Sequence, residues 1–583
     1  MEREVFENPQ IAPYMNEHFI NIKVDREERP DLDELYMLAT QMLTGSGGWP
    51  MSVWLTPGLK PFYAGTYFPP EDQYGRPGFP SVLSAITHAW RDQQPQVLEQ
   101  ADHVAQSIAD HLNATPPPPA RKEPLAWIDA ALRESQRRID LTWGGFSGAP
   151  KFPPHQTLLF WIALLQPSAL SLLATPPITI SPALIKTWLT TTLDRMAAGG
   201  IYDQIAGGFS RYSTDEQWLV PHFEKMLYDN AQLALIYAQA GVLLDRADYI
   251  RIATETLDFW LREMTGADGL FFSSLDADSE GVEGKFYVWS WQDILAAIPA
   301  EADRILAGEY WNLTPAGNWE GRNIPHVTAE VEQLATRHGQ SPHLIQSRLH
   351  DIRQRMLDIR STRIAPHCDD KILAGWNGLM IRALAEAALL LNEPRYYQAG
   401  VKAAASILKV HRDAEGNLLH VSRAGRADVP AFLEDYVGLG LATWSLATAA
   451  KRLAPGEEHI WIDTTRQMAQ SAVENFYQSH TGRFFISSQR HEKLFVRVPS
   501  AGDNAVPSAA AMAITLLLKA DSAVPGSTYP AIVERGLAAL APHIARFPLA
   551  FSTMLDTLVR HPHLMAPSGV AISSGGCGGG CCR

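Results

Sequence analysis

The chain has 583 residues, of which 46% are hydrophobic and 19% are charged. This length exceeds what one hydrophobic core usually serves, so we expect at least two domains. The net charge of −14 argues against a surface for nucleic acid or anionic membranes, and four cysteines in this length exclude a disulfide framework. The start MEREVFENPQ lacks the apolar region of a signal peptide, and prolines interrupt the uncharged stretch 152–185. We therefore expect a soluble, cytoplasmic protein with no membrane partner.

Mixed α/β patterning characterises the first part of the chain, residues 1–114. The expected elements are a strand at 19–24 (FINIKV), a helix at 31–43, strands at 51–55 and 61–68, and helices between 80 and 112. Successive prolines in the stretch 115–122 favour an extended conformation and end any helix. We expect the boundary between two domains at this stretch.

Helical periodicity dominates from residue 123 onward. The expected helices cover 124–139, 155–166, 182–198, 222–243, 247–264, 340–359, 372–391, 395–411, 431–453, 458–478, 507–519, 528–545 and 548–560. Long helices in near-antiparallel order predict a helical toroid or solenoid, and no strict short repeat is visible. Residues 561–583 are expected to form a flexible glycine-rich tail, whose three cysteines lack a fourth ligand for zinc.

The most informative stretch is 199–233, GGIYDQIAGGFSRYSTDEQWLVPHFEKMLYDNAQL. Pro221 is predicted to begin a helix, which puts Lys225 and Asp229 at the i,i+4 spacing that allows pairing. A polar and aromatic loop that leads into a helix can line a pocket. A buried polar network that fixes a helix corner uses the same residue types, so both interpretations stay open. The candidate residues here are Asp203, Arg211, Tyr212, Trp218, His222 and Glu224.

Acidic residues recur in four later segments. In the hairpin 271–290, Asp276 and Asp278 mimic the start of a calcium loop, but the twelfth position is Tyr287 and not glutamate, so we predict no metal site. The hairpin either enters a pocket or is a solvated turn. Asp369 and Asp370 precede a helix, where they can cap it or supply a general acid and base. Trp376 and Asn377 follow them, and the remaining candidates are Glu434, Asp435 and Asp503.

The segment GGFSRYSTDEQWLVPHFEKMLYDNAQL resembles the signature of the spermatogenesis-associated protein 20 family, whose members contain a thioredoxin domain. The segments GSGGWPMSVWLTP, TWGGFSGAPKFP, RIAPHCDDKILAGWNGL and DNAVPS resemble further motifs of that family. The resemblance extends from Glu2 to about Arg560 and implies an α+β multidomain protein that is mostly helical. It implies a partial thioredoxin-like domain at 1–114, in which Pro50 would be a cis proline. It also implies an (α/α)6 toroid at 123–560, similar to six-hairpin glycosidases, whose loops form a funnel at one end.

One departure from the family concerns redox chemistry. Family members carry a CxxC-type motif just before the residues that match 1–4, whereas this chain begins there and has no cysteine before Cys368. Thiol–disulfide exchange needs two thiols in close reach, one of them with a lowered pKa. We therefore assign no such activity to the chain as given.

The resemblance implies a carbohydrate-binding or carbohydrate-processing funnel, by analogy of fold. Glycosyl chemistry needs two carboxylates on opposite sides of a sugar. The candidate catalytic residues are Asp435, Asp276, Asp369 and Glu224. The candidate substrate-binding residues are Arg211, Tyr212, Trp218, His222, Asp203, Trp376, Asn377 and Asp503. We expect a carbohydrate or small-molecule ligand, with no cofactor, metal or nucleic acid. The alternatives are a thiol–disulfide oxidoreductase in a full-length parent and a non-catalytic interaction scaffold.

Overall fold

The computed structural model describes residues 1–73, 75–114, 123–500, 502–523 and 526–565. The predicted proline-rich linker at 115–122 lies outside the described residues, and so do positions 566–583 of the predicted tail with their three cysteines. Helix α4 ends at Asn113 and α5 begins at Pro124. We keep the predicted domain boundary between these two helices as a proposal.

The N-terminal part combines short helices with one antiparallel strand pair. Its elements are a π-helical turn (Glu2–Phe6), α1 (Ala12–His18), α2 (Pro30–Thr44), β1 (Ser52–Leu55), β2 (Pro61–Gly65), α3 (Phe79–Asp92) and α4 (Gln94–Asn113). Val53 pairs with Ala64 in the ladder. The peptide bond between Trp49 and Pro50 is cis, as the resemblance implied.

One strand prediction in this part is wrong. The segment 19–24 forms no strand, and Ile20 and Ile22 are 94% and 74% exposed. Alternation of apolar residues makes a strand only where another backbone is available to hydrogen-bond with it. No strand among the described residues pairs with this segment.

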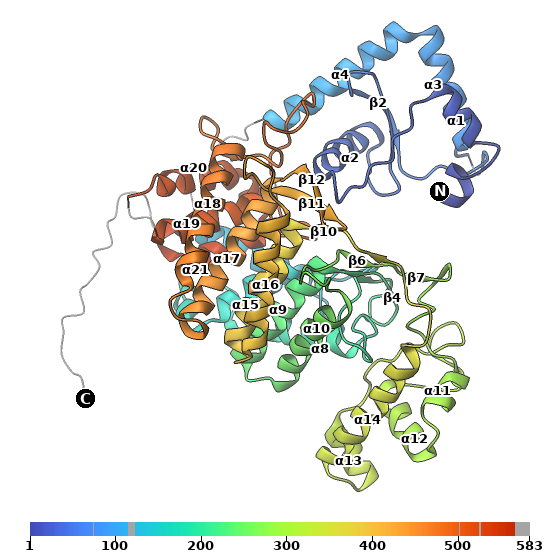
Figure 1. Ribbon diagram of the computed structural model, residues 1–583, viewed down its shortest axis with the longest axis vertical. Helices are drawn as coiled ribbons and strands as arrows, with labels where there is room; N and C mark the ends of the chain where they lie inside the picture. The colour runs from blue at the N-terminus through green and yellow to red at the C-terminus, as the bar shows by residue number, and fades with distance from the viewer. Residues whose placement is uncertain (74, 115–122, 501, 524–525, 566–583) are drawn as a thin grey trace.

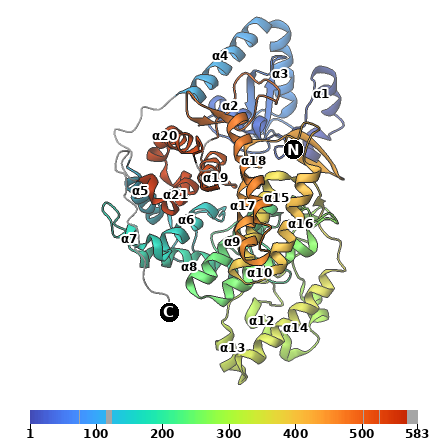
Figure 2. The same ribbon diagram turned by 60° about the vertical axis from the view of Figure 1, so that its left-hand side comes forward.

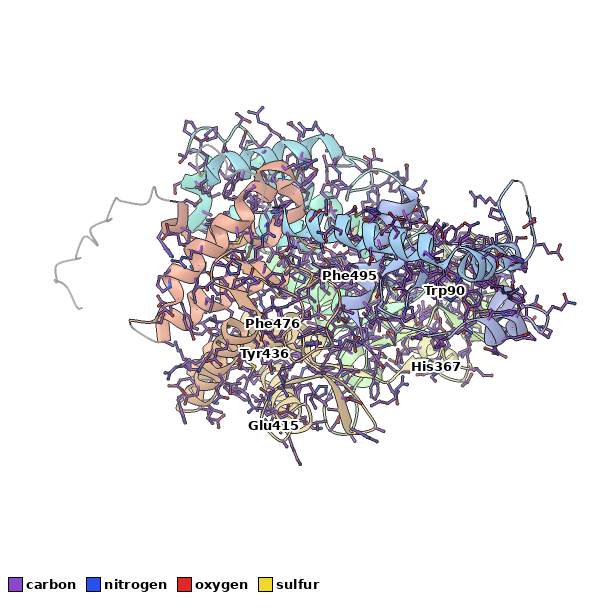
Figure 3. All side chains as sticks on the ribbon, turned by 90° about the horizontal axis from the view of Figure 1, so that it is seen from above. Trp90, His367, Glu415, Tyr436, Phe476 and Phe495 are labelled. Carbon is purple, nitrogen blue, oxygen red and sulfur yellow. The ribbon has the colours of Figure 1, made fainter. Side chains whose placement is uncertain are left out.

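Helix α2 joins the N-terminal part to the rest of the molecule (Figures 1 and 2). Its buried face, with Leu35, Tyr36 and Ala39, forms one apolar cluster with Ile108 of α4 and Val498 of the C-terminal half. Phe495, labelled in Figure 3, packs against the same cluster. Burial of shared apolar surface is the main favourable contribution to such an association. Helix α2 is therefore packed against the rest of the molecule.

The helical part is an (α/α)6 toroid, as predicted. Within the described residues, the inner ring consists of α6 (His155–Leu165), α9 (Leu227–Leu244), α15 (Ala374–Leu390), α17 (Leu433–Leu453), α19 (Ala509–Ala523) and α21 (Ser552–Arg560). Each inner helix packs on the next, and α21 packs on α6 to close the ring. The outer helices are α5 (Pro124–Arg138), α8 (Pro182–Ala198), α10 (Ala247–Glu263), α16 (Pro394–Val410), α18 (Glu458–Phe476) and α20 (Tyr529–Arg546).

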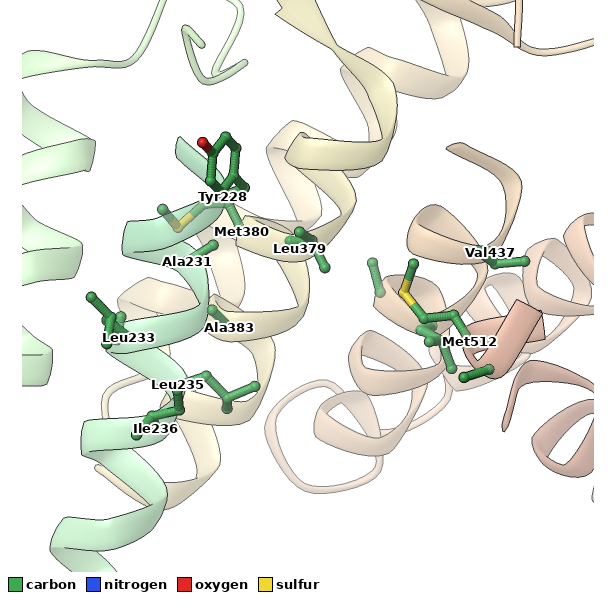
Figure 4. Close-up of a cluster of buried hydrophobic side chains, with 14 of the residues drawn as sticks. Tyr228, Ala231, Leu233, Leu235, Ile236, Leu379, Met380, Ala383, Val437 and Met512 are labelled. Atoms are coloured by element: carbon green, nitrogen blue, oxygen red, sulfur yellow. The ribbon is translucent and has the colours of Figure 1, made fainter. Parts of the chain in front are cut away.

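Composition explains which helices lie inside. Every residue of α9 from Leu227 to Ala238 is buried, and a helix that is apolar on all sides must be covered on all sides. Figure 4 shows Leu235 of α9 near Ala383 of α15, while Val437 and Met512 belong to the next two inner helices. Outer helices such as α10 have one apolar face only. The two-layered ring follows from this difference.

A helical lobe with its own core projects from the ring (Figure 1). It contains α11 (Trp291–Ala297), α12 (Glu301–Trp311), α13 (Val331–His338) and α14 (Pro342–Arg360). Only α14 was predicted. Helices α11 and α13, with 7 and 8 residues, are too short to establish a clear period in the sequence.

The predicted helix start at Pro221 is wrong. Residues 221–226 form β4 (Pro221–His222) and β5 (Lys225–Met226), and α9 begins at Leu227. Since β5 pairs with β6 (Ser274–Leu275), the chain must enter α9 in an extended conformation. Lys225 therefore points to Asp203 and does not pair with Asp229.

The remaining strands and short helices lie in loops. They are α7 (Leu170–Leu173), β3 (Tyr212–Ser213), β7 (Asp278–Ser279), β8 (Val282–Glu283), β9 (Cys368–Asp369), β10 (Ile372–Leu373), β11 (Leu419–Arg423), β12 (Arg426–Pro430), β13 (Tyr477–Gln478) and β14 (Arg483–Phe484), with 3-10 turns at Pro167–Ala169, Pro548–Phe551 and Pro562–Met565. No single helix in the described ranges has the length and apolarity to cross a membrane. Only the bent pair His155–Leu165 and Pro167–Leu173 reaches that length and composition together.

Candidate functional site

A cavity of about 980 Å³ lies between α2 and the toroid. One stripe of α2 lines it at helical spacing: Pro30, Asp33, Glu34, Met37, Leu38 and Gln41. Residues at i, i+3, i+4 and i+7 share one helix face. Because Leu35, Tyr36 and Ala39 of α2 pack in the apolar cluster described above, this stripe is held toward the cavity.

The toroid contributes the N-terminal ends of its inner helices. The lining includes His155 of α6, Tyr228 and Asp229 of α9, Trp376 of α15, Glu434 of α17 and Ala510 of α19, together with Arg211 from the loop before α9. The inner helices are parallel, so their first turns meet at one end of the ring. Residues distant in sequence thus share one wall.

Asp229 and His155 form a buried pair at this wall. The His155 Nε2 atom lies 3.3 Å from Asp229 Oδ1, and the two residues are 4% and 2% exposed. Burial raises the pKa of Asp229 well above its usual range and lowers the pKa of His155 to about 3. Asp229 Oδ2 has no hydrogen-bond partner. Burial therefore disfavours the charged form of both members of the pair.

Polar and aromatic groups adjoin this pair. Arg211 donates a hydrogen bond of 3.1 Å to Glu224. Burial lowers the pKa of Arg211, but the nearby Tyr228 and Glu224 outweigh burial, and the pKa is raised. The rings of Tyr228 and Trp376 meet edge to face at 4.7 Å. Such a pair is rigid, since each ring restricts the other.

Two further carboxyl groups face the cavity from opposite elements, Glu34 of α2 and Glu434 of α17. Burial, followed by the charge of Glu434 and that of Asp33, raises the pKa of Glu34 to about 7. Burial, followed by Asp435, also raises the pKa of Glu434 to about 7. Both groups are thus partly protonated at neutral pH.

Asp435 lies behind Glu434 and is fully buried. It accepts hydrogen bonds from the N–H groups of Gly375 (2.7 Å) and Phe432 (2.8 Å) and pairs with His420 Nδ1 at 2.8 Å. His420 Nε2 lies 2.7 Å from the carbonyl oxygen of Glu27. Burial lowers the pKa of His420, but Asp435 outweighs this effect and raises the pKa to about 9. His420 is therefore a cation that joins the toroid to the N-terminal part.

The same residues bear on metal binding. His420, Glu434 and Asp435 each place one possible ligand atom within 4.8 Å of the others. A histidine binds a metal through the lone pair of a neutral ring nitrogen. Both ring nitrogens of His420 are engaged, one with the Asp435 carboxylate and the other with a carbonyl oxygen that can only accept. This donor set does not suit a metal ion.

Lys371 forms a second junction between the two parts. Its Nζ atom lies 3.0 Å from Glu27 and 2.9 Å from Asp369, and it also donates to Asp25. Burial opposes the charge of Lys371, but the three carboxylates outweigh burial and raise its pKa. Glu27 lines the cavity, so this junction fixes part of the rim.

Replacing Lys371 by methionine is expected to loosen α2, because it leaves the half-buried Glu27 without its partner. A loss of about 2 kcal/mol would speed local opening roughly 30-fold. Hydrogen exchange of the α2 amides measures this opening. Lys23→Met, at a lysine whose side chain is 91% exposed, serves as the control and should leave the rates unchanged. Equal exchange in Lys371→Met and the parent chain would contradict the assignment.

The structure distributes the predicted site residues unevenly. Arg211 and Trp376 line the cavity. Glu224 lies one contact behind the lining, through Arg211, and Asp435 directly follows the lining residue Glu434 in the chain. Asp503 lies between two lining residues, where burial raises its pKa to about 6 and the N–H groups of Ser508 and Thr553 bond it.

The other predicted residues are not among those that line the cavity. Asp203 is bound by Lys225 and Arg360, and Trp218 and Asn377 are buried with backbone partners. Tyr212 stacks on His222 at 5.0 Å, and His222 Nδ1 lies 2.7 Å from Glu283. Asp369 pairs with Lys371 at the rim, and Asp276 is exposed. Whether any of the twelve acts on a ligand stays a prediction.

Several cavity residues were missed by sequence reasoning. His155 is a polar residue at the start of an otherwise apolar helix, HQTLLFWIALL, and that contrast was a usable signal. Glu34, Asp33 and Glu27 carry no such signal, because an acidic residue in an amphipathic helix or loop usually faces solvent. Only the docking of α2 turns them toward the toroid.

Among solved structures, the chain is similar to cellobiose 2-epimerase from Bacillus thermoamylovorans, with 9% identity, a TM-score of 0.42, and coverage of 70% of this chain and 86% of that one. It is also similar to a D-mannose isomerase, with 11% identity, a TM-score of 0.43, and coverage of 72% and 86%.

Sequence comparison gives closer relatives. The family model Thioredox_DsbH, described as a protein of unknown function, DUF255, matches residues 1–109, so the N-terminal part is thioredoxin-like, as predicted. Spermatogenesis-associated protein 20 of Mus musculus is 31% identical, over 96% of this chain and 73% of that protein. Its Homo sapiens counterpart is 32% identical over 555 residues, which cover 89% of this chain and 69% of the human protein. The chain therefore belongs to the spermatogenesis-associated protein 20 family.

Proposed function

We propose that the cavity binds a carbohydrate and that Asp229 exchanges a proton with it. The supporting observation is an arrangement of three inner helices. Asp229 and Glu434 stand in the first turns of α9 and α17, and α15 packs between these helices with Trp376 in its own first turn. An aromatic face thus has a carboxyl group on either side. Glycosyl chemistry requires two carboxyl groups that flank a sugar.

The protonation states suit this proposal. Burial disfavours the carboxylate of Asp229 and raises its pKa, which suits a general acid. Glu434, with its pKa raised to about 7 by burial and by Asp435, can accept a proton at neutral pH. Arg211, held by Glu224, can donate to sugar hydroxyl groups. A volume of about 980 Å³ accommodates a small oligosaccharide.

Titration of the full chain with neutral disaccharides, followed by tryptophan fluorescence and calorimetry, tests the proposal. Asp229→Asn is expected to weaken binding about tenfold, because a carboxyl donor in a buried site is worth about 1.4 kcal/mol or more. Asp245→Asn is the matched control, since Asp245 is exposed and directly follows α9. Equal affinity in Asp229→Asn and the parent chain would defeat the assignment.

Product analysis in the same mixtures separates an enzyme from a binding protein. Binding without turnover would favour the interaction scaffold, and no binding by any saccharide would end the carbohydrate proposal. The cytoplasmic location expected from the sequence stays a prediction, and fractionation of the source cells tests it.

A further inference from the structure

The cavity holds an imbalance between acidic and basic side chains. Glu34 and Glu434 make no hydrogen bond or ion pair to any residue in the described ranges. Asp229, which is 2% exposed and lines the same cavity, keeps one carboxyl oxygen without a partner. Glu34 is exposed and Glu434 is half-buried, whereas the unpaired oxygen of Asp229 is shielded from water, and a shielded polar atom without a partner is costly unless something else satisfies it.

The basic side chains of the lining are already engaged. Arg211 binds Glu224, and Arg26 lies over the ring of Trp49 at 4.3 Å. Arg483 donates to the backbone carbonyl groups of Leu112 and Ala114, at 2.8 and 2.7 Å. None of these cations bonds to Glu34 or Glu434. The wall therefore presents acidic groups that no lining cation neutralises.

We propose that the ligand of this cavity carries a protonated amine, which binds between Glu34 and Glu434 beside Trp376. This inference rests on the proposed carbohydrate function and narrows its substrate class to a sugar with a free amino group. An ammonium group offers three donors and no acceptor, which matches two carboxyl groups that lack donors. The aromatic face of Trp376 further favours an organic cation.

A metal cation fits the site less well. Calcium takes six to eight oxygen ligands and magnesium a near-ideal octahedron. Glu34 and Glu434 belong to α2 and α17, two elements of separate parts, and His420 behind them has no free lone pair. One ammonium group needs only two acceptors at hydrogen-bond distance.

Charge coupling predicts a proton release on binding. Burial raises the pKa of both Glu34 and Glu434 to about 7, with a further contribution from the charge of Glu434 at Glu34 and from the charge of Asp435 at Glu434. A bound ammonium favours the two carboxylates, so both pKa values fall and protons leave for the buffer. The other charged and titratable groups near the pair are Asp33, Asp435, His420, Glu27, Arg26 and Asp229.

Calorimetry on the full chain at pH 7 tests the inference, in phosphate and in HEPES, which differ in ionisation enthalpy. The probes are the β-1,4-linked glucosamine dimer, its N-acetylated form and cellobiose. The amine dimer is expected to bind at least tenfold tighter than the other two and to release protons. Glu34→Gln should remove both the preference for the amine dimer and the proton release. Glu99→Gln is the control, since the Glu99 side chain on α4 is 74% exposed, and this variant should keep both properties.

Stability without ligand gives a second readout on the same variant. Because the pKa of Glu34 is raised in the folded state, the free energy of unfolding of the protein falls as the pH rises from the pKa of an unfolded glutamate toward about 7. Glu34→Gln should therefore exceed the parent chain in thermal stability at pH 8 and match it near pH 4.5. Equal stability of the two proteins at pH 8 would overturn the coupling.

Each binding result has a distinct meaning. Equal affinity for the amine dimer and cellobiose overturns the ammonium inference and leaves the carbohydrate proposal standing. Equal affinity for putrescine and the amine dimer supports recognition of an ammonium group and overturns the proposal that the ligand is a sugar. Calcium or magnesium binding that depends on Glu34, with no amine binding, overturns the inference in favour of a metal. Binding by none of the probes defeats both proposals.

Discussion

Replacing Asp435 by asparagine is expected to lower the free energy of unfolding by about 3 kcal/mol. Asp435 is fully buried and accepts two backbone N–H groups, while its charge holds the buried His420 imidazolium. Asparagine keeps one acceptor, directs an N–H₂ group at a second donor, and removes the negative charge. Urea unfolding measures the loss.

The pH dependence of that loss follows from His420. Burial lowers the pKa of His420 but Asp435 raises it to about 9, above the unfolded value near 6.5. Its stabilising contribution is therefore complete below about pH 6.5 and is lost as pH rises through about 9. The difference between the parent chain and Asp435→Asn should shrink from pH 6 to pH 10. Asp428→Asn, at an exposed aspartate of β12, should differ from the parent by less than about 0.5 kcal/mol.

This prediction also separates two roles for Asp435. A catalytic carboxylate contacts its substrate, whereas Asp435 has no exposed surface and lies behind Glu434. We propose that it positions Glu434 and holds the N-terminal part through His420. An Asp435→Asn variant that is as stable as the parent but inactive on a saccharide would reverse this assignment.

Replacing Asp203 by asparagine is expected to cost about 4 kcal/mol, the largest loss we predict. Asp203 accepts two hydrogen bonds of 2.9 Å from Arg360 and one of 2.9 Å from Lys225. Both cations are buried, and the side chain of Asp203 is 8% exposed. Burial opposes the charge of Asp203, but Arg360 and Lys225 outweigh it and hold its pKa far below the usual range. Without the carboxylate, two buried cations face each other.

Arg360 is the last residue of α14, so this cluster attaches the helical lobe to the ring. Calorimetric unfolding should therefore show a lower transition temperature, with the lobe lost first. Burial lowers the pKa of Lys225 to about 8 despite Asp203. Loss of Asp203 lowers the pKa of Lys225 further. The difference in the free energy of unfolding between the parent chain and Asp203→Asn should therefore become smaller above pH 8, where Lys225 is neutral. Asp351→Asn, at an exposed position of α14, is the control. A stable Asp203→Asn variant would show that the lobe is held by other contacts.

The placement of individual helices was largely predictable from the sequence. The helices at 182–198 and 247–264 appear as α8 and α10 within one residue, because a helix period depends on neighbours three and four positions away. The start of α9 was not predictable, since β5 is held by β6, almost fifty residues later. Pro221 favours a helix start locally, and tertiary pairing overrides that preference.

The sequence by itself determined the family, the thioredoxin-like and toroidal parts, and the inward position of the apolar helices. It also singled out Arg211 and Trp376, which line the cavity. Only the tertiary structure decided which carboxyl groups face that cavity and which are neutralised by partners. The His420 side chain and the carbonyl oxygen of Glu27 are 393 positions apart in the chain and form a hydrogen bond. Glu34 and Glu434, from equally distant segments, line the same cavity. The pKa of a carboxyl group depends on burial and on charges a few ångströms away, and those neighbours come from segments that the sequence does not place together.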